Sequence, residues 1–483
     1  MALADLVPLL PLIAVATGAL VLLMAISFYR HYQLAVFITL LTLALAFAAL
    51  PLSFDGEPRQ ITPLLVVDGT AVFYTGLLLA TSFALTLLSH GYIRSLPVNR
   101  EEFYLLLLLS TMGALTLVVS SHFASFFLGL ELLSVSLYSL ISYQRFPQHR
   151  VEAAIKYLIL AGATSAFLLF GMALVYAVQG TMGFEGASPT ALAGAENTIL
   201  LAGWALVTVG VGFKLALVPF HLWTPDVYQG APAPVTAYIA TVSKGGVFAL
   251  LLRFFPPAAI VENEALWFMF AGIAVASMLY GNLVALMQTN VKRILAYSSI
   301  AQLGYLLVAF LASGELGLQA SAFFLAAYFI TSLMAFGVVM VLSNRGEEAE
   351  ELADYHGLFW RDRRLAVVFT AALLSLAGIP PTAGLIGKIY VAAAGVEASL
   401  WTLLIILVVG SVIGAFYYLR IVIRMFRRPE EQEAAARPFL PTGLSLPSGI
   451  ALALLTVLLV GLGVYPAPLL RVVQALVTVM NGP

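Results

Sequence analysis

The chain has 483 residues, of which 61% are hydrophobic and only 10% are charged, and its formal net charge is −1. A soluble globular protein carries about 25% charged residues, so the composition indicates an integral membrane protein, and the charge balance offers no basic surface for nucleic acid. Cysteine is absent, which excludes disulfides, cysteine-bound iron–sulfur clusters and thiol catalysis in this chain.

The polar residues give no sign of a metal or nucleotide site. The six histidines are scattered without metal-ligand spacing, and neither a G-x-G-x-x-G nor a G-x-x-x-x-G-K-[ST] loop occurs. We therefore expect this chain to bind no metal and no cofactor. The only early charge is Asp5, so the first apolar run is expected to be a retained span and not a signal peptide.

Apolar runs of the length that a bilayer requires, about 20 residues, follow one another along the chain. They predict an all-α integral membrane protein with about fourteen transmembrane helices. The predicted spans lie near residues 5–28, 33–52, 70–92, 102–120, 123–143, 153–179, 198–219, 235–255, 265–288, 293–312, 317–343, 365–396, 400–424 and 447–475.

Two of these runs are interrupted, which predicts discontinuous seventh and twelfth helices. The seventh contains Pro219 and leads into a proline-rich stretch, and the twelfth has Gly378, Pro380 and Pro381 near its middle. Irregular backbone at membrane depth is tolerated only where protein or a water-lined cavity covers it. Breaks at corresponding places in two halves suggest inverted repeats.

We therefore predict one polytopic membrane domain over residues 1–483. Its expected parts are three first helices (about 1–95), two half-channel repeats (about 100–255 and about 265–428) and a last helix (about 447–475). The longest hydrophilic connections, near 344–364 and 425–446, are short, so no separate soluble domain is expected.

The basic residues of the loops predict the orientation. With the amino terminus placed outside, sixteen Lys and Arg side chains lie in connections on the inner side of the membrane. Three lie in connections on the outer side or at the helix ends there. Cytoplasmic loops carry an excess of Lys and Arg. Both termini are therefore expected on the outer side of the membrane.

Charged side chains inside the spans are the strongest functional signal. Glu131, Lys214, Lys244 and Lys388 each lie well inside a span, where a charge costs roughly 2.5–3.5 kcal/mol on insertion scales. Structural ion pairing is the alternative, but three lysines share one carboxylate, so pairing alone cannot neutralise them. The set predicts a relay for protons or another small cation.

Weaker candidates surround this set. Lys156 lies only one turn inside the sixth span, where a lysine can extend to water, so a structural role stays open. Stripes of hydroxyl and amide side chains can hold ordered water for proton transfer or simply bond neighbouring helices. These stripes comprise Ser134, Tyr138 and Ser142 after Glu131 on the fifth span, and Ser298, Gln302 and Tyr305 on the tenth.

Three longer motifs carry a family resemblance. The stretch 213–235, FKLALVPFHLWTPDVYQGAPAPV, resembles the signature of the antiporter-like membrane subunits of respiratory complex I, the NADH-quinone oxidoreductase. Ser243-Lys244, the stretch YSSIAQLGY at 297–305 and the stretch GIPPTAGLIGK at 378–388 fit the same family. The resemblance extends from about Val67 to about Tyr465.

The loop at 225–230 favours one branch of this family. Lys388 favours the same branch, because a second branch of the family has glutamate at this position. A third branch carries a long lateral carboxy-terminal helix, which we do not expect here.

The resemblance implies a role for each buried charge. Glu131 would be the fifth-helix carboxylate that pairs with Lys214, and Lys214 would be the broken-helix lysine that gains and loses a proton. Lys244 would be the central relay, and Lys388 the donor or acceptor at the far half-channel. His221 matches a family histidine beyond the seventh-helix break, where it would either take part in proton transfer or cap polar groups of the loop.

The resemblance also implies an assembly. The chain would be one subunit of a proton-translocating NADH:quinone oxidoreductase (enzyme class EC 7.1.1) in the bacterial cytoplasmic membrane, with its termini on the periplasmic side. Its partners would be the lipid bilayer and the other membrane subunits of complex I. Other subunits of the complex would bind NADH, FMN, the iron–sulfur clusters and the quinone. Their electron transfer would be coupled to proton pumping through this chain.

Three alternatives remain open from the sequence. A subunit of an Mrp-type sodium/proton antiporter shares the helix plan and the buried lysines, although the loop at 225–230 argues against it. A stand-alone secondary transporter of an anionic solute would use lysines at helix breaks, but here the lysines are spread over three spans. A non-pumping scaffold would tolerate neutralisation of Lys214.

Overall fold

The computed structural model describes residues 3–97, 99–144, 148–185, 195–343, 348–428 and 444–477, and these residues are almost entirely helical. The elements are η1 (Leu3–Leu9), α1 (Leu10–Phe28), α2 (Tyr32–Ala48), α3 (Leu50–Ser53), β1 (Arg59–Thr62), β2 (Leu65–Val67), α4 (Gly69–Ser95), α5 (Glu101–Val119), α6 (Phe123–Ile141), α7 (Gln148–Gln179), α8 (Ala195–Leu215), α9 (Trp223–Gly230), α10 (Ala233–Tyr238), η2 (Ile239–Ser243), α11 (Lys244–Phe254), α12 (Pro257–Glu262), α13 (Glu264–Met287), α14 (Val291–Ala312), α15 (Gly314–Leu342), α16 (Leu358–Arg361), α17 (Arg363–Ala377), α18 (Ala383–Glu397), α19 (Trp401–Phe426), α21 (Leu446–Val464) and α22 (Ala467–Val477).

The helices confirm the predicted all-α membrane class. Within the described ranges, twelve helices are long and apolar enough to cross a membrane. The two further predicted spans correspond to α2, which has 17 residues, and to the pair α17 and α18, with 15 residues each. The total of fourteen crossings and the inverted repeats stay predictions. The antiparallel ribbon of β1 and β2 was not predicted.

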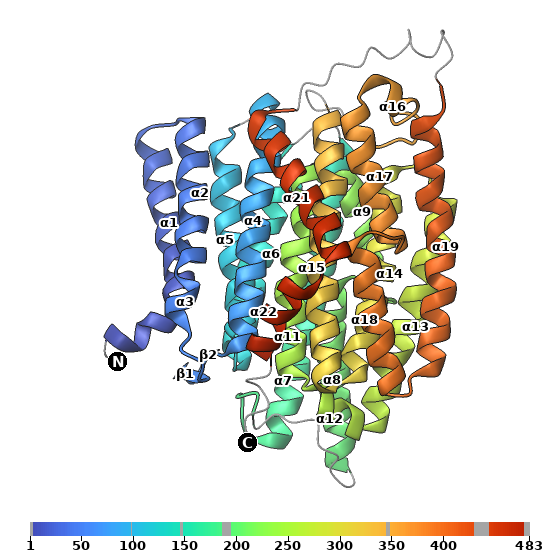
Figure 1. Ribbon diagram of the computed structural model, residues 1–483. Coiled ribbons are helices and arrows are strands. Elements are labelled where there is room, and N and C mark those ends of the chain that lie inside the picture. The colour runs from blue at the N-terminus through green and yellow to red at the C-terminus, as the bar shows by residue number, and fades with distance from the viewer. Residues whose placement is uncertain are drawn as a thin grey trace.

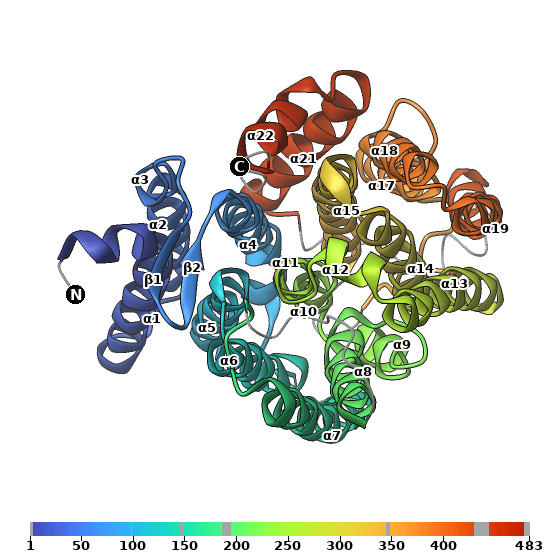
Figure 2. The same ribbon diagram turned by 90° about the horizontal axis from the view of Figure 1, so that it is seen from below.

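The helices stand side by side in one array (Figure 1). Seen from below in Figure 2, α10 and α11 lie near the middle, with α1 to α3 at one edge and α19 at the opposite edge. Every residue in the most apolar window of Ala233–Phe254 and of Val291–Ala312 is buried. The two spans that carry Lys244 and the second polar stripe are therefore enclosed by protein. The first and last helices, η1 and α22, lie at the end of the array opposite α16.

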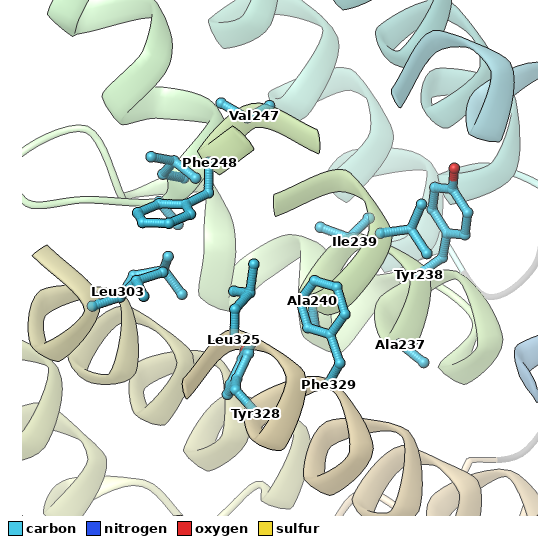
Figure 3. Packing of buried hydrophobic residues seen from close by; sticks show 14 of the residues in the cluster. Ala237, Tyr238, Ile239, Ala240, Val247, Phe248, Leu303, Leu325, Tyr328 and Phe329 are labelled. Atoms are coloured by element: carbon cyan, nitrogen blue, oxygen red, sulfur yellow. The ribbon is translucent and has the colours of Figure 1, made fainter. Parts of the chain in front are cut away.

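The central span, which runs from α10 through η2 to α11, contains a π-helical segment. Figure 3 shows side chains of this span, among them Ile239 and Ala240, close to Leu325 and Phe329 of α15. Between α10 and α11 the five residues Ile239–Ser243 form the π-helix η2, and Lys244 follows directly. Such π-turns occur frequently at functional sites. Nothing in the sequence pattern predicted it.

The chain is interrupted between α8 and α9. α8 ends at Leu215 and α9 begins at Trp223, and Pro219 between them has no N–H with which to continue a helix. The indole of Trp223 donates to the carbonyl oxygen of Phe213 at 2.8 Å. This hydrogen bond ties the start of α9 to the last turn of α8.

A second interruption separates α17 from α18. α17 ends at Ala377, Gly378 takes a left-handed φ of 83°, and α18 begins at Ala383. Glycine adopts this conformation without steric cost. The amide of Ile379 then donates back to the carbonyl oxygen of Leu374 at 2.9 Å, which closes the end of α17.

Candidate functional site

Lys214 lies in the last turn of α8 with its side chain enclosed by α6 and α7. It is 2% exposed. Its ammonium donates to the hydroxyl of Ser134 at 2.7 Å and to the hydroxyl of Tyr157 at 3.1 Å. It also lies 5.1 Å from the centre of the Tyr157 ring. A cation above an aromatic face gains electrostatic stabilisation, so the pocket partly compensates the loss of water.

Glu131 lies on α6, one turn before Ser134, and is only partly buried. Its carboxylate accepts a hydrogen bond from the Ser165 hydroxyl of α7 at 2.6 Å. Among the ion pairs of the described residues none joins Glu131 to Lys214. Glu131 bonds Ser165, whereas Lys214 bonds Ser134 and Tyr157, so the direct pair that the resemblance implied is absent from this conformation.

Lys244 begins α11 and is completely buried. Its ammonium donates to the Ser299 hydroxyl of α14 at 2.6 Å. Ser299 in turn shares a hydrogen bond with Tyr328 of α15, 2.6 Å away, and one with Tyr228 of α9, 3.3 Å away. A lysine without a carboxylate thus contacts a cluster of hydroxyl groups that both donate and accept.

Lys388 of α18 reaches back to the end of α17. Its ammonium donates to the carbonyl oxygens of Leu376 at 3.0 Å and Ala377 at 3.1 Å. The carboxyl end of a helix carries partial negative charge, so a cation is favoured there. Gln302 donates to the same Leu376 oxygen at 3.0 Å, and the Tyr305 ring centre lies 5.1 Å from the lysine nitrogen.

A row of polar side chains lies between Lys244 and Lys388. Ser298, the neighbour of Ser299, shares a hydrogen bond with Tyr418 of α19. The rings of Tyr418 and Tyr417 are 4.3 Å apart. Tyr417 donates to the Asn282 amide oxygen at 3.1 Å, and the amide nitrogen of Asn282 donates to Tyr305 at 2.8 Å. Ser298, Gln302 and Tyr305 therefore all take part in the contacts between the two lysines.

The other candidates lie differently. Ser142 bonds the carbonyl oxygen of Tyr138, so only Ser134 of the first stripe contacts a buried lysine. His221 is buried between the helix pieces, with its ring centre 4.6 Å from that of Tyr280. Pro219 lies in the first interruption, and Gly378, Pro380 and Pro381 lie in the second.

Lys156 belongs to an exposed charge cluster and not to the buried row. Its ammonium lies 2.9 Å from Glu152 and 2.9 Å from Asp226, and Arg293 also contacts Asp226 at 2.9 Å. Burial alone would raise the pKa of the Asp226 carboxyl. The two cations lower this pKa by more than burial raises it, so it lies below its ordinary value. This geometry favours the structural interpretation of Lys156.

Sequence reasoning missed several members of the row. Tyr157, Tyr228, Ser299, Tyr328 and Tyr418 were not singled out. Apart from Tyr228, which lies in the short helix α9, each is a polar group in an otherwise apolar span. Polar groups inside membrane spans usually bond another helix, which is the signal that was available. Their partners could not be read because they come from other helices.

Lys214, Lys244 and Lys388 share one property. Among the described residues no carboxylate lies within ion-pair distance of Lys214, Lys244 or Lys388. Taking a charge out of water is costly unless it is paired. The contacts of these three ammonium groups are instead hydroxyl groups, carbonyl oxygens and aromatic rings. No three potential metal ligands gather in the described part of the chain.

Comparison with known proteins identifies the family. Residues 120–414 match the family model described as NADH:quinone oxidoreductase/Mrp antiporter, TM. A curated relative, NADH-quinone oxidoreductase subunit N of Ectopseudomonas mendocina (strain ymp), is 47% identical over 476 residues, which cover 97% of this chain and 96% of the relative.

Solved structures agree on the fold. A chain of respiratory complex I from Thermus thermophilus with bound aureothin has a TM-score of 0.81 and 34% identity, covering 96% of this chain and 99% of that one. A chain of the Mrp complex from Dietzia sp. DQ12-45-1b has a TM-score of 0.83 at 21% identity, covering 99% of this chain and 97% of that one. The fold alone therefore does not separate the two kinds of complex, whereas sequence identity does. The chain belongs to the NADH:quinone oxidoreductase/Mrp antiporter family of membrane subunits, and within it to NADH-quinone oxidoreductase subunit N.

Proposed function

We propose that this chain translocates protons as the subunit N of a bacterial NADH-quinone oxidoreductase, and that Glu131, Lys214, Lys244 and Lys388 form the relay. The observation that carries the proposal is the set of three buried lysines that, among the described residues, have no carboxylate partner and bond hydroxyl groups or carbonyl oxygens. Structural lysines would instead be expected to meet carboxylates.

The first half of the relay rests on Glu131 and Lys214. An ionised Glu131 one turn from Ser134 stabilises the ammonium form of Lys214. If movement in a neighbouring subunit draws the two apart or neutralises the carboxylate, the buried ammonium loses that support and releases its proton towards Lys244. No hydrogen bond that the structure describes joins the partners of Lys214 to those of Lys244, so ordered water would complete this step.

The second half runs from Lys244 to Lys388. Ser299, Tyr328 and Tyr418 can each accept one proton while donating another. Gln302 and Lys388 meet at one carbonyl oxygen. A proton that leaves Lys244 would therefore pass along hydroxyl groups and intervening water to Lys388, from which it leaves by the far half-channel.

The remaining parts of the reaction belong to partners. NADH oxidation, FMN, iron–sulfur clusters and quinone reduction would lie in other subunits of the complex, because this chain has no cysteine and no nucleotide-binding loop. The excess of Lys and Arg on one side of the predicted spans supports termini on the periplasmic side.

We expect the isolated chain to be inactive. Purified chain in liposomes should not acidify or alkalinise the lumen on addition of NADH, because nothing in it can take up electrons. A pH-sensitive dye in the lumen measures this, and the intact complex in the same lipid is the positive control. Proton uptake by the chain alone with NADH would contradict the assignment of the redox chemistry to partners.

We expect Lys388→Ala to lower proton pumping strongly and Lys388→Glu to lower it less. Alanine removes the titrating group, whereas a protonated glutamic acid can still donate to the carbonyl oxygens at the end of α17. Proton uptake by inverted membrane vesicles, at matched levels of assembled complex, checks both. Equal pumping by the alanine variant and the wild type would remove Lys388 from the pathway.

A stand-alone solute transporter fits the structure less well. Lysines that bind one anionic solute should converge on one cavity, whereas here each lysine has its own set of contacts on a different span.

A further inference from the structure

A fifth lysine, Lys292, lies outside the relay and is equally buried. It stands in the first turn of α14, and its side chain is 0% exposed, while its partner Glu348 is 4% exposed. In the sequence Lys292 falls between two predicted spans, so it was included among the sixteen Lys and Arg of the inner connections. The structure instead encloses it with a carboxylate, which none of the three buried relay lysines has.

The ion pair of Lys292 and Glu348 holds the connection between α9 and α10. Lys292 donates to the carbonyl oxygens of Gln229 at 2.9 Å and Ala231 at 2.7 Å, and to the Glu348 carboxylate. Glu348 in turn accepts from the amide of Ala233 at 2.9 Å. All three ammonium protons are therefore used, and two of them bond backbone.

Glu348 is held from another side as well. Tyr92 of α4 donates to the same carboxylate. Burial alone would raise the pKa of the Glu348 carboxyl. Lys292, Tyr92 and the nearby Arg150 together lower this pKa by more than burial raises it, so it lies below its ordinary value. These neighbours favour the ionised carboxylate, in keeping with its ion pair to Lys292.

The held segment connects the two central relay lysines. On one side, α9 begins at Trp223, whose indole bonds the Phe213 carbonyl next to Lys214. On the other side, α10 leads through the π-helix η2 directly into Lys244. A shift of this connection would therefore move the surroundings of both lysines.

Lys292 also sets the register of α14 against the central span. Ser299 lies seven residues further along α14, which places it two turns away on the same face. Ser299 accepts a hydrogen bond from Lys244 and shares one with Tyr228 of α9. Lys292 and Ser299 thus both bond residues 228–231, from positions two turns apart on α14.

We propose that Lys292 and Glu348 form a permanent latch that positions the α9–α10 connection, and through it Lys214 and Lys244, without carrying a proton themselves. This proposal rests on the proposed relay. It assigns positioning residues that touch neither relay lysine, and it separates the buried lysines of this chain into three that release protons and one that does not.

A comparison of an arginine and a glutamine substitution at Lys292 tests the latch. Arginine cannot release its proton at accessible pH but keeps charge and donors. We expect Lys292→Arg to retain most proton pumping with an unchanged pH profile, whereas Lys292→Gln lowers pumping about fivefold or more, as expected for a coupling residue. If Lys292→Arg assembles and pumps as poorly as Lys292→Gln, the latch is overturned and Lys292 carries protons.

The paired neutral variant covers the case in which a single variant assembles poorly. Removing one partner leaves a buried unpaired charge, whereas removing both does not. Lys292→Gln with Glu348→Gln should therefore assemble and pump better than either single variant. A double variant that is no better than the worse single variant would contradict the latch, because two proton carriers would be lost together.

Backbone exchange gives a readout independent of pumping. In the purified complex, hydrogen–deuterium exchange of peptides covering residues 223–236 should rise in Glu348→Gln and fall back in the double variant, while peptides of α1 and α2 stay unchanged. Unchanged exchange at 223–236 would refute positioning. Failure of the relay itself is seen separately, in normal pumping by Lys214→Arg.

Discussion

Lys214→Arg is expected to leave the complex assembled and to lower proton pumping by about tenfold or more, since a positioned proton-transfer group typically contributes about 10²–10⁴-fold. Arginine preserves the positive charge and can still donate to Ser134 and Tyr157, so the pocket stays satisfied. It cannot give up its proton at accessible pH. Proton uptake by inverted membrane vesicles on NADH addition, with subunit levels matched by immunoblot, measures the effect.

The matched control is the same substitution at Lys156. This lysine lies in an exposed cluster with Glu152 and Asp226, and arginine can keep both contacts. We expect Lys156→Arg to pump close to the wild-type rate. Normal pumping by Lys214→Arg would instead favour a scaffold role for the chain, because a permanently charged side chain cannot relay.

Gly384→Ala is expected to disturb the second interruption more than any other small change in α18. A Cβ on Gly384 would overlap the backbone carbonyl oxygen of Ser375 and lie 2.6 Å from its hydroxyl oxygen. Backbone cannot rotate away as a side chain can, so α17 and α18 must separate. Overpacking of this kind costs about 1–3 kcal/mol, occasionally more, and it draws Lys388 away from Leu376 and Ala377.

The measurement is the thermal stability of the purified complex, followed by proton uptake in vesicles. Gly272→Ala in α13 is the control, because a Cβ there meets no heavy atom within 4 Å, and alanine favours a helix over glycine. We expect a lowered midpoint and reduced pumping only for Gly384→Ala. Equal behaviour of the two variants would show that the contact between α17 and α18 tolerates separation.

Composition and hydrophobic pattern alone determined the class of this protein. A chain with 61% hydrophobic residues and repeated apolar runs can satisfy its backbone in a bilayer only as helices or as a closed barrel, and runs of about 20 residues select helices. The proline and glycine positions indicated where helices would be interrupted, because proline removes a backbone donor and Gly378 permits a positive φ. The cost of a charge in the membrane singled out Lys214, Lys244 and Lys388.

Only the tertiary structure decided what these charges contact. Spacing along one helix tells which side chains share a face, but not which helix that face meets. Tyr328, Tyr418 and Asn282 could therefore not be recognised as neighbours of the buried lysines, and the separate partners of Glu131 and Lys214 could not be distinguished from a direct ion pair.

Lys292 shows the same limit most clearly. In the sequence it stands beside Arg293 at the edge of an apolar run and is typical of a loop charge. In the structure the connection at 229–233 and Glu348, more than fifty residues away in either direction, close over it. Burial is a property of the assembled helices, so the same residue type at the end of a span is solvated at Lys156 and enclosed at Lys292.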